Sequence, residues 1–147
     1  MTTNTIPKPA LVLGLAGLIP FVCSALLTLS DNADVQSFAT MSLAAYGAVI
    51  LSFLGGVKWG IALSDNNALT SWQPLILSVL PSIVGWLALL LPAIFMLIVL
   101  SAALVGQYCL DNNSVQQQKL PIWYGKLRLI LSCGAVLSLL IGLWAHL

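Results

Sequence analysis

Lys58 is the residue best placed to do chemistry, because it is a charge set well inside an apolar segment. It lies seven residues before Asp65, which is about 10 Å along a helix. An ionisable side chain at such depth in a membrane indicates a functional site by default. The alternative is a lysine whose flexible stem carries its ammonium group to the aqueous interface. Side chains lean toward the N-terminus of their own helix, and for Lys58 this lean points away from the nearer interface. An inward-facing functional lysine and a snorkelling lysine both remain open.

Several polar groups are expected at a depth similar to that of Lys58. Ser78 and Gln107 lie at matching positions in two other apolar segments. Pro20 and Pro81 each lack the amide hydrogen that would bond the carbonyl four residues earlier, so each leaves a carbonyl free. These groups predict a polar pocket around Lys58, Ser78 and Gln107. An anionic headgroup or a polar ring could enter such a pocket from the inner leaflet.

The sequence shows no pattern typical of an enzyme, so we expect neither catalysis nor a cofactor. It contains no Walker A loop, no HExxH, no GxSxG and no Cys/His metal cluster. The single histidine, His146, lies near the C-terminus, which excludes bis-histidine haem ligation within one chain. Proton relays in membranes use chains of Asp, Glu or His, and we expect no acid deep in any helix. Cys23, Cys109 and Cys133 are expected to be small packing residues.

The composition indicates that lipid is the solvent of this chain. Of its 147 residues, 60% are hydrophobic and 6% are charged, whereas a soluble domain has about 25% charged residues. The formal net charge of +1 gives no electrostatic support for a nucleic-acid partner. We therefore predict an all-α, polytopic membrane bundle in contact with the lipid bilayer.

The apolar segments predict a single transmembrane domain, 1–147, with five helices. A membrane core of about 30 Å needs roughly 20 apolar residues. The segment from Trp72 to Leu110 is about twice that length, so we place a turn at Pro92 and a polar loop from Asp111 to Lys119. The predicted helices are 9–29, 38–63, 73–91, 93–110 and 122–144.

The basic residues predict the orientation, because cytoplasmic loops are enriched in Lys and Arg. A cytoplasmic N-terminus puts all five basic residues on the cytoplasmic side and the C-terminus in the periplasm. Lys126 and Arg128 are then read as ordinary interface anchors at the start of the last helix. The N-terminal segment lacks the Arg-rich and Ser-rich character of a transit peptide, which favours a bacterial inner membrane.

Small residues recur at every fourth position of the second predicted helix. Rows of this kind let helices approach closely in lipid, where association gains no hydrophobic energy. The interface is either between helices of this chain or with a homo-oligomer or membrane-protein partner. The predicted packing residues are Ala48, Ser52, Gly56 and Gly60, with a shorter row of Gly134, Ser138 and Gly142 in the last helix.

Four segments together resemble the family known as domain of unknown function 3429, a transmembrane protein 69-like family of small multi-pass membrane proteins. They read LGLAGLIPF (13–21), AYGAVILSFLGGVKWG (45–60), LPSIVGW (80–86) and WYGKLR (123–128). The second segment is the most specific of the four. The resemblance implies a basic or imidazole side chain at position 58 and a link to mitochondrial relatives, and it implies no reaction.

Two function classes follow from these observations. The first is a non-catalytic accessory or assembly protein of a membrane complex, such as one of the respiratory chain. The alternative is a small transporter, or a membrane protein that binds a lipid or quinone-type ligand in a polar pocket around Lys58. The missing catalytic groups and the small-residue rows favour the first, and the proline-containing helices favour the second.

Overall fold

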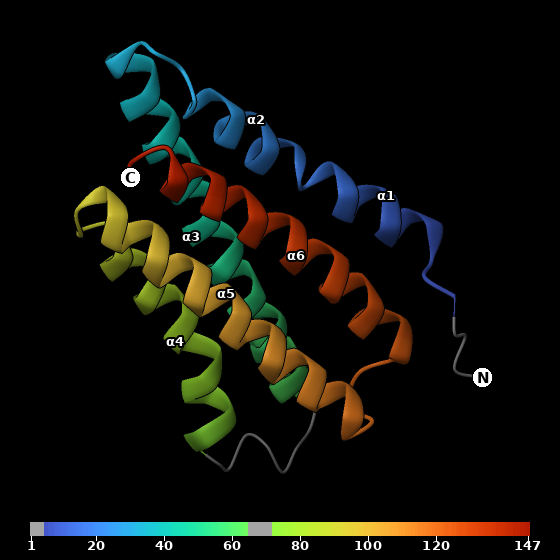
Figure 1. Cartoon of the computed structure of the whole chain (residues 1–147). Coiled ribbons are helices and arrows are strands. Elements are labelled where there is room, and N and C mark those ends of the chain that lie inside the picture. Colours follow the sequence, from blue (N-terminus) through green and yellow to red (C-terminus); the bar gives the residue numbers. More distant parts are fainter. Residues whose placement is uncertain (1–4, 65–71) are drawn as a thin grey trace.

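The computed structural model describes residues 5–64 and 72–147, and these residues form helices joined by short connections. The helices are α1 (Lys8–Ala16), α2 (Ile19–Leu27), α3 (Ala33–Ser64), α4 (Trp72–Ala88), α5 (Ala93–Gln116) and α6 (Ile122–Trp144). Figure 1 shows them as an elongated bundle, with the start of α1 and the end of α6 at opposite ends. The predicted all-α class is confirmed.

Helices α1 and α2 together form one span that is interrupted in its middle. Pro20 lacks the amide hydrogen that would continue the α-helical pattern, and the chain makes a tight turn at Gly17 and Leu18. The Tyr46 hydroxyl of α3 donates a 2.9 Å hydrogen bond to the Gly17 carbonyl oxygen. A side chain of another helix therefore satisfies a backbone group at this break, as lipid could not.

The helices match the dimensions of a lipid bilayer. Among the described residues, four spans are long and apolar enough to cross one, namely Lys8–Leu27, α3, α5 and α6. The described part of α4 is a shorter apolar helix of 17 residues, or about 26 Å. Many large apolar side chains point outward, among them Phe38 and Phe53, which are 73% and 65% exposed. The protein is a multi-pass membrane protein.

Two helix boundaries differ from the predicted ones by five residues or more, and both differences have identifiable reasons. The third predicted helix, 73–91, ends earlier, at Ala88. Helix α3 begins at Ala33 rather than at 38, because Asn32 Oδ1 accepts hydrogen bonds from the amides of Asp34 and Val35 and so caps the helix. Helix α5 continues to Gln116 instead of ending at 110. The first six residues of the predicted polar loop are therefore helical, and Asp111 belongs to α5. The predicted turn at Pro92 and the range 122–144 agree with the structure.

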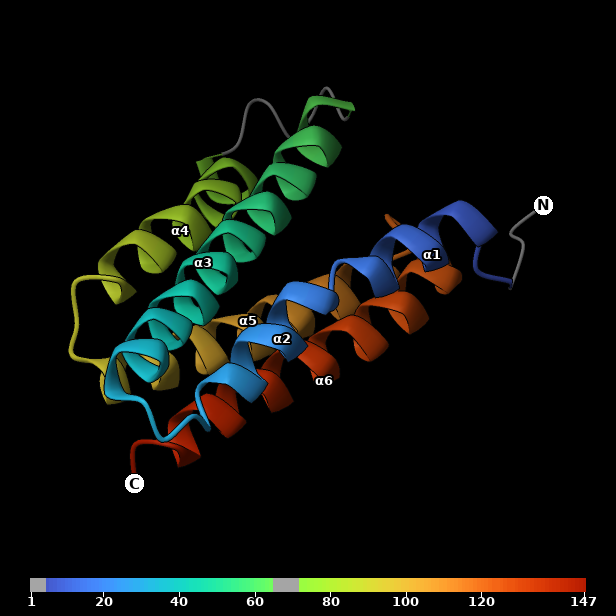
Figure 2. The ribbon, with the colours of Figure 1, turned by 90° about the horizontal axis from the view of Figure 1, so that it is seen from above.

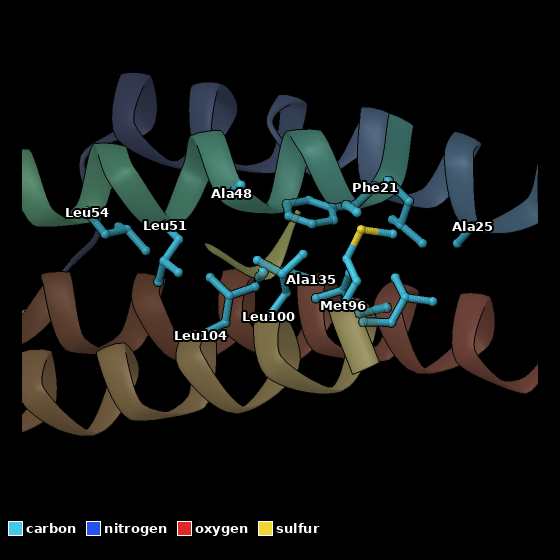
Figure 3. Close-up of a cluster of buried hydrophobic side chains, with 14 residues drawn as sticks. Phe21, Ala25, Ala48, Leu51, Leu54, Met96, Leu100, Leu104 and Ala135 are labelled. Atoms are coloured by element: carbon cyan, nitrogen blue, oxygen red, sulfur yellow. The ribbon is translucent and has the colours of Figure 1, made fainter. Parts of the chain in front are cut away.

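The bundle is built around α3, which packs against α2, α4, α5 and α6. Helices α5 and α6 also form an extensive pair, whereas α1 packs against α6. Figure 2 shows α3 lying beside α2 at one end of the bundle and diverging from α1 toward the other end. In Figure 3, Phe21, Leu51, Met96 and Leu100 lie among the side chains that fill the space between α2, α3, α5 and α6.

Candidate functional site

Charged side chains from three helices meet inside the bundle. Asp111 of α5 is 2% exposed, and its Oδ1 lies 3.2 Å from Nζ of Lys58 in α3. Its Oδ2 accepts a 2.8 Å hydrogen bond from Nε of Arg128 in α6. Gln107, one turn earlier in α5, donates from Nε2 to Asp111 Oδ1 at 3.2 Å. We call these four residues the Asp111 cluster; its carboxylate is shared by two cations and an amide.

The Asp111 cluster answers the question that the sequence left open for Lys58. The Lys58 side chain is 13% exposed and paired with a carboxylate that is itself buried, so it faces inward and does not snorkel. The cluster contains two cations and one anion, which leaves a formal charge of +1 (two minus one). A buried charge costs several kcal/mol unless it is paired and its remaining donors are satisfied.

Two buried polar atoms at the cluster, one of them on Arg128, lack a hydrogen-bond partner in the described part of the chain. Arg128 Nη2 and Ser132 Oγ are buried and have no hydrogen-bond partner among the described residues. Arg128 is 5% exposed and Ser132 is 7% exposed, and they lie one turn apart on α6. Each buried polar atom without a partner costs about 1–3 kcal/mol, so such atoms are rare and call for an explanation.

Arg128 and Ser132 both line a cavity of about 320 Å³. Its walls come from α1, α2, α3, α5 and α6, and most of its surface is apolar. The side chains on the walls include Leu13, Phe21, Phe53, Leu54, Leu104 and Leu131. Tyr124, one turn before Arg128, also lines it. The cavity has residues of both α1 and α3 on its walls, the two helices that diverge in Figure 2. Its size and apolar character are typical of a small ligand site.

The Asp111 cluster lies where α5 packs against α6, and the spacing of buried residues along both helices accounts for this position. Buried residues in each of these helices follow steps of three and four, the pattern that keeps one face against a partner helix. One such row of buried residues in α5 consists of Leu97, Leu100, Leu104, Gln107 and Asp111, and one in α6 consists of Arg128, Ser132, Ala135, Leu139 and Gly142. The expectation that no acid lies deep in a helix was wrong, and so was the reading of Arg128 as an ordinary anchor. The steps of three and four along α5 and α6 could have revealed that Asp111 and Arg128 are buried.

The structure brings together two of the three predicted ligand-binding residues. Lys58 and Gln107 come together, because both contact Asp111 Oδ1. Ser78 does not join them in any contact of the described residues: its hydroxyl donates a 2.6 Å hydrogen bond to the Leu75 carbonyl of its own helix. The ligand-binding role assigned to these residues stays a prediction.

The small-residue row of α3 packs in part against α4. A Cβ built on Gly85 would lie 3.3 Å from Ala48, and the hydroxyls of Ser52 and Ser82 lie 2.9 Å apart. The next close approach is at Gly55 and not at Gly56.

Helix geometry explains this shift. Each step of four residues turns about 40° beyond a full circle, so a strict fourth-residue row drifts away from its partner helix. At Gly56 and Gly60 an added Cβ would meet nothing within 4 Å. These two glycines do not pack within the described part of the chain.

The shorter row on α6 packs against two other helices. A Cβ on Gly134 would lie 2.8 Å from the Leu18 side chain, and one on Gly142 would lie 2.7 Å from Leu43. Ser138 is buried and donates a 2.9 Å hydrogen bond to the Gly134 carbonyl of its own helix. These glycines let α2 and α3 approach α6 closely.

Comparisons with known proteins agree with this description of a multi-pass membrane protein. Transmembrane protein 69 of Xenopus tropicalis is 41% identical over 138 residues, covering 90% of this chain and 53% of that protein. Transmembrane protein 69 of Mus musculus is 31% identical over 138 residues, covering 93% of this chain and 56% of that protein. The chain thus spans about half the length of these relatives. No solved structure matches. The family model described as "Protein of unknown function (DUF3429)" matches residues 6–144, and the chain belongs to this family.

Proposed function

We propose that the protein is a non-catalytic membrane protein that binds an amphipathic molecule from the bilayer in the cavity beside Arg128. One observation carries this proposal: two buried, unpartnered hydrogen-bonding groups, Arg128 Nη2 and Ser132 Oγ, belong to residues on the wall of an otherwise mostly apolar cavity. A ligand with an apolar body and an oxygen acceptor satisfies both features at once.

The energetic reason is the cost of leaving these groups unpaired in a medium without water. An acceptor placed between Arg128 and Ser132 removes a penalty of about 1–3 kcal/mol for each atom. The apolar walls add roughly 25 cal/mol for each Å² of ligand surface that they cover. Lipids and quinone-type molecules share the required chemistry.

Serine-to-alanine variants at two positions of α6 test this proposal. The intact chain is purified in mild detergent, and native mass spectrometry measures the amphipathic molecules that it retains. Ser132→Ala removes a donor at the cavity, and we expect roughly two- to tenfold weaker retention, equivalent to one hydrogen bond. Ser138→Ala is the matched control, because Ser138 is buried on the same helix but does not line the cavity. Equal retention by both variants and the parent would contradict the proposal.

A second candidate function is that of an accessory or assembly protein of a membrane complex, such as a respiratory one. The open faces of Gly56 and Gly60 favour it, since a helix of another protein could approach α3 closely there. A pull-down of the tagged chain with mass spectrometry, repeated with Gly60→Leu, tests this role. Loss of one stoichiometric partner in the variant supports it, and an unchanged set of proteins counts against it.

For the location we propose the inner membrane of a bacterium, with the N-terminus in the cytoplasm. The order of the helices supports this, because all five basic residues fall at the end of the bundle where α1 begins and α3 ends. Two acids lie at the opposite end: Asp31 in the connection into α3 and Asp34 in the first turn of α3. Such an asymmetry is typical of a cytoplasmic side rich in Lys and Arg.

A further inference from the structure

We infer that the ligand of the cavity is an anionic amphipath, with a carboxylate or phosphate group at Arg128 and Ser132 and an apolar chain in the cavity. This inference rests on the proposed function and narrows it to one class of ligand. It is carried by the charge of the Asp111 cluster together with the unpartnered guanidinium nitrogen of Arg128, a residue that lines the cavity.

The charge balance of the cluster is the first step. Asp111 is one anion shared by Lys58 and Arg128, so the cluster keeps one uncompensated positive charge. The other acids of the described residues, Asp31 and Asp34, lie at the far end of the bundle. Inside a protein in lipid, an excess charge interacts more strongly with a counter-charge than it does in water. An anion in the cavity would bring the local charge to zero.

The geometry of Arg128 is the second step. Its Nε is committed to Asp111 Oδ2 at 2.8 Å, which holds the guanidinium plane in place, while its Nη2 has no partner. Guanidinium groups form their strongest hydrogen bonds with carboxylates and phosphates, and these charge-assisted bonds are roughly twice as strong as neutral ones. Asp111 therefore acts as a positioning residue that presents Arg128 Nη2 to the ligand.

The shape of the site is the third step. The donors belong to α6 at the same end of the bundle as the other basic residues, and the cavity extends from them along apolar side chains of α1, α2 and α3. A volume of about 320 Å³ suits one apolar chain with a small head, or part of one chain of a larger lipid. A charged head at the basic end and a chain directed into the bilayer is the normal orientation of a membrane lipid.

A matched pair of ligands tests the charge. The full chain is reconstituted in nanodiscs of neutral phosphatidylcholine and titrated with oleate and with methyl oleate, which have the same chain but differ in the head. We expect oleate to bind at least tenfold more tightly. A parallel titration with phosphatidylglycerol distinguishes a free carboxylate from a phospholipid headgroup as the source of the anion. The inference is supported if oleate binds more tightly than methyl oleate, or phosphatidylglycerol more tightly than neutral phosphatidylcholine.

Variants separate this inference from the proposed function. Lys58→Met removes one positive charge without touching the cavity wall, so oleate binding should fall on the order of tenfold while methyl oleate binding stays unchanged. The Arg128–Asp111 pair remains to hold the helices together in this variant. Arg128→Gln should abolish the preference for oleate, and Ser132→Ala serves if Arg128→Gln does not fold.

The outcomes are distinct. If methyl oleate or a neutral quinone binds as tightly as oleate, the protein binds an amphipath but the inference of an anionic head is overturned. If none of these molecules binds and Ser132→Ala changes nothing, the proposed function fails together with the inference.

Discussion

Lys58 of α3 and Asp111 of α5 form a buried ion pair, with Nζ and Oδ1 3.2 Å apart, and they are 53 positions apart in the chain. Arg128 of α6 shares the same carboxylate. The Asp111 carboxylate therefore links three helices at one end of the bundle, the end where α1 diverges from α3 (Figure 2). We infer that the cluster holds this end together while leaving the cavity beside it open.

Asp111→Ala should destabilise the protein strongly. The substitution leaves Lys58 and Arg128 as buried cations without their shared anion, and breaking a buried pair costs about 3–5 kcal/mol. Thermal unfolding of the purified chain in mild detergent measures the loss. Asp34→Ala is the control, because Asp34 is an exposed acid in the first turn of α3 and its removal should cost about 1 kcal/mol or less.

Adding Lys58→Met to Asp111→Ala should restore part of the lost stability. The double variant no longer buries the lysine charge without a partner, so its unfolding temperature should lie above that of Asp111→Ala alone. Purely additive losses in this double-mutant cycle would show that the two side chains do not interact as the structure describes.

Much of the fold could be predicted from the sequence, because hydropathy and helix length are strong signals in lipid. The hairpin at Pro92 and the last helix followed directly from the apolar runs and the bilayer thickness. Hydropathy fails at helix ends, where polar residues continue a helix. Asn32 adds an N-terminal turn by capping α3, and the polar segment after Leu110 continues α5 to Gln116.

The candidate site could be predicted only in part. Lys58 was evident as a charge in an apolar segment, and Gln107 was expected at a similar depth. Asp111 and Arg128 were missed because each lies near a helix end, where a charge is usually solvated. Their burial depends on the pairing of α5 with α6, and the spacing of buried residues in each helix carries that information. The cavity is lined by residues of five helices, and no local pattern encodes how these helices meet.

Tyr46→Phe should destabilise the break between α1 and α2. The variant loses the 2.9 Å hydrogen bond to the Gly17 carbonyl but keeps the edge-to-face contact with Phe21, whose ring centroid lies 4.9 Å from that of Tyr46. We expect a loss of about 0.5–1.5 kcal/mol, measured by thermal unfolding in detergent. Tyr108→Phe is the matched control, since the Tyr108 hydroxyl makes no hydrogen bond among the described residues. Equal losses from both variants would mean that the hydrogen bond to Gly17 does not stabilise the break.

Reporter fusions should place the two termini on opposite sides of the membrane. Alkaline phosphatase is active only in the periplasm and green fluorescent protein fluoresces only in the cytoplasm. The positions of the basic residues predict an active phosphatase at the C-terminus and a fluorescent reporter at the N-terminus in a bacterial host. The reversed pattern would overturn the orientation, and both reporters on one side would overturn an odd number of spans.

Gly55→Ala and Gly56→Ala should have opposite effects although the two glycines are adjacent. A Cβ on Gly55 collides with the Ser78 carbonyl oxygen of α4, so α3 and α4 must separate, at a cost of about 1–3 kcal/mol. A Cβ on Gly56 meets nothing within 4 Å, and replacing a helical glycine with alanine gains up to about 1 kcal/mol. Thermal unfolding in detergent compares the two variants directly. If Gly56→Ala were also destabilising, another chain must cover that face of α3; if Gly55→Ala were harmless, α4 would not lie against α3 at Ser78.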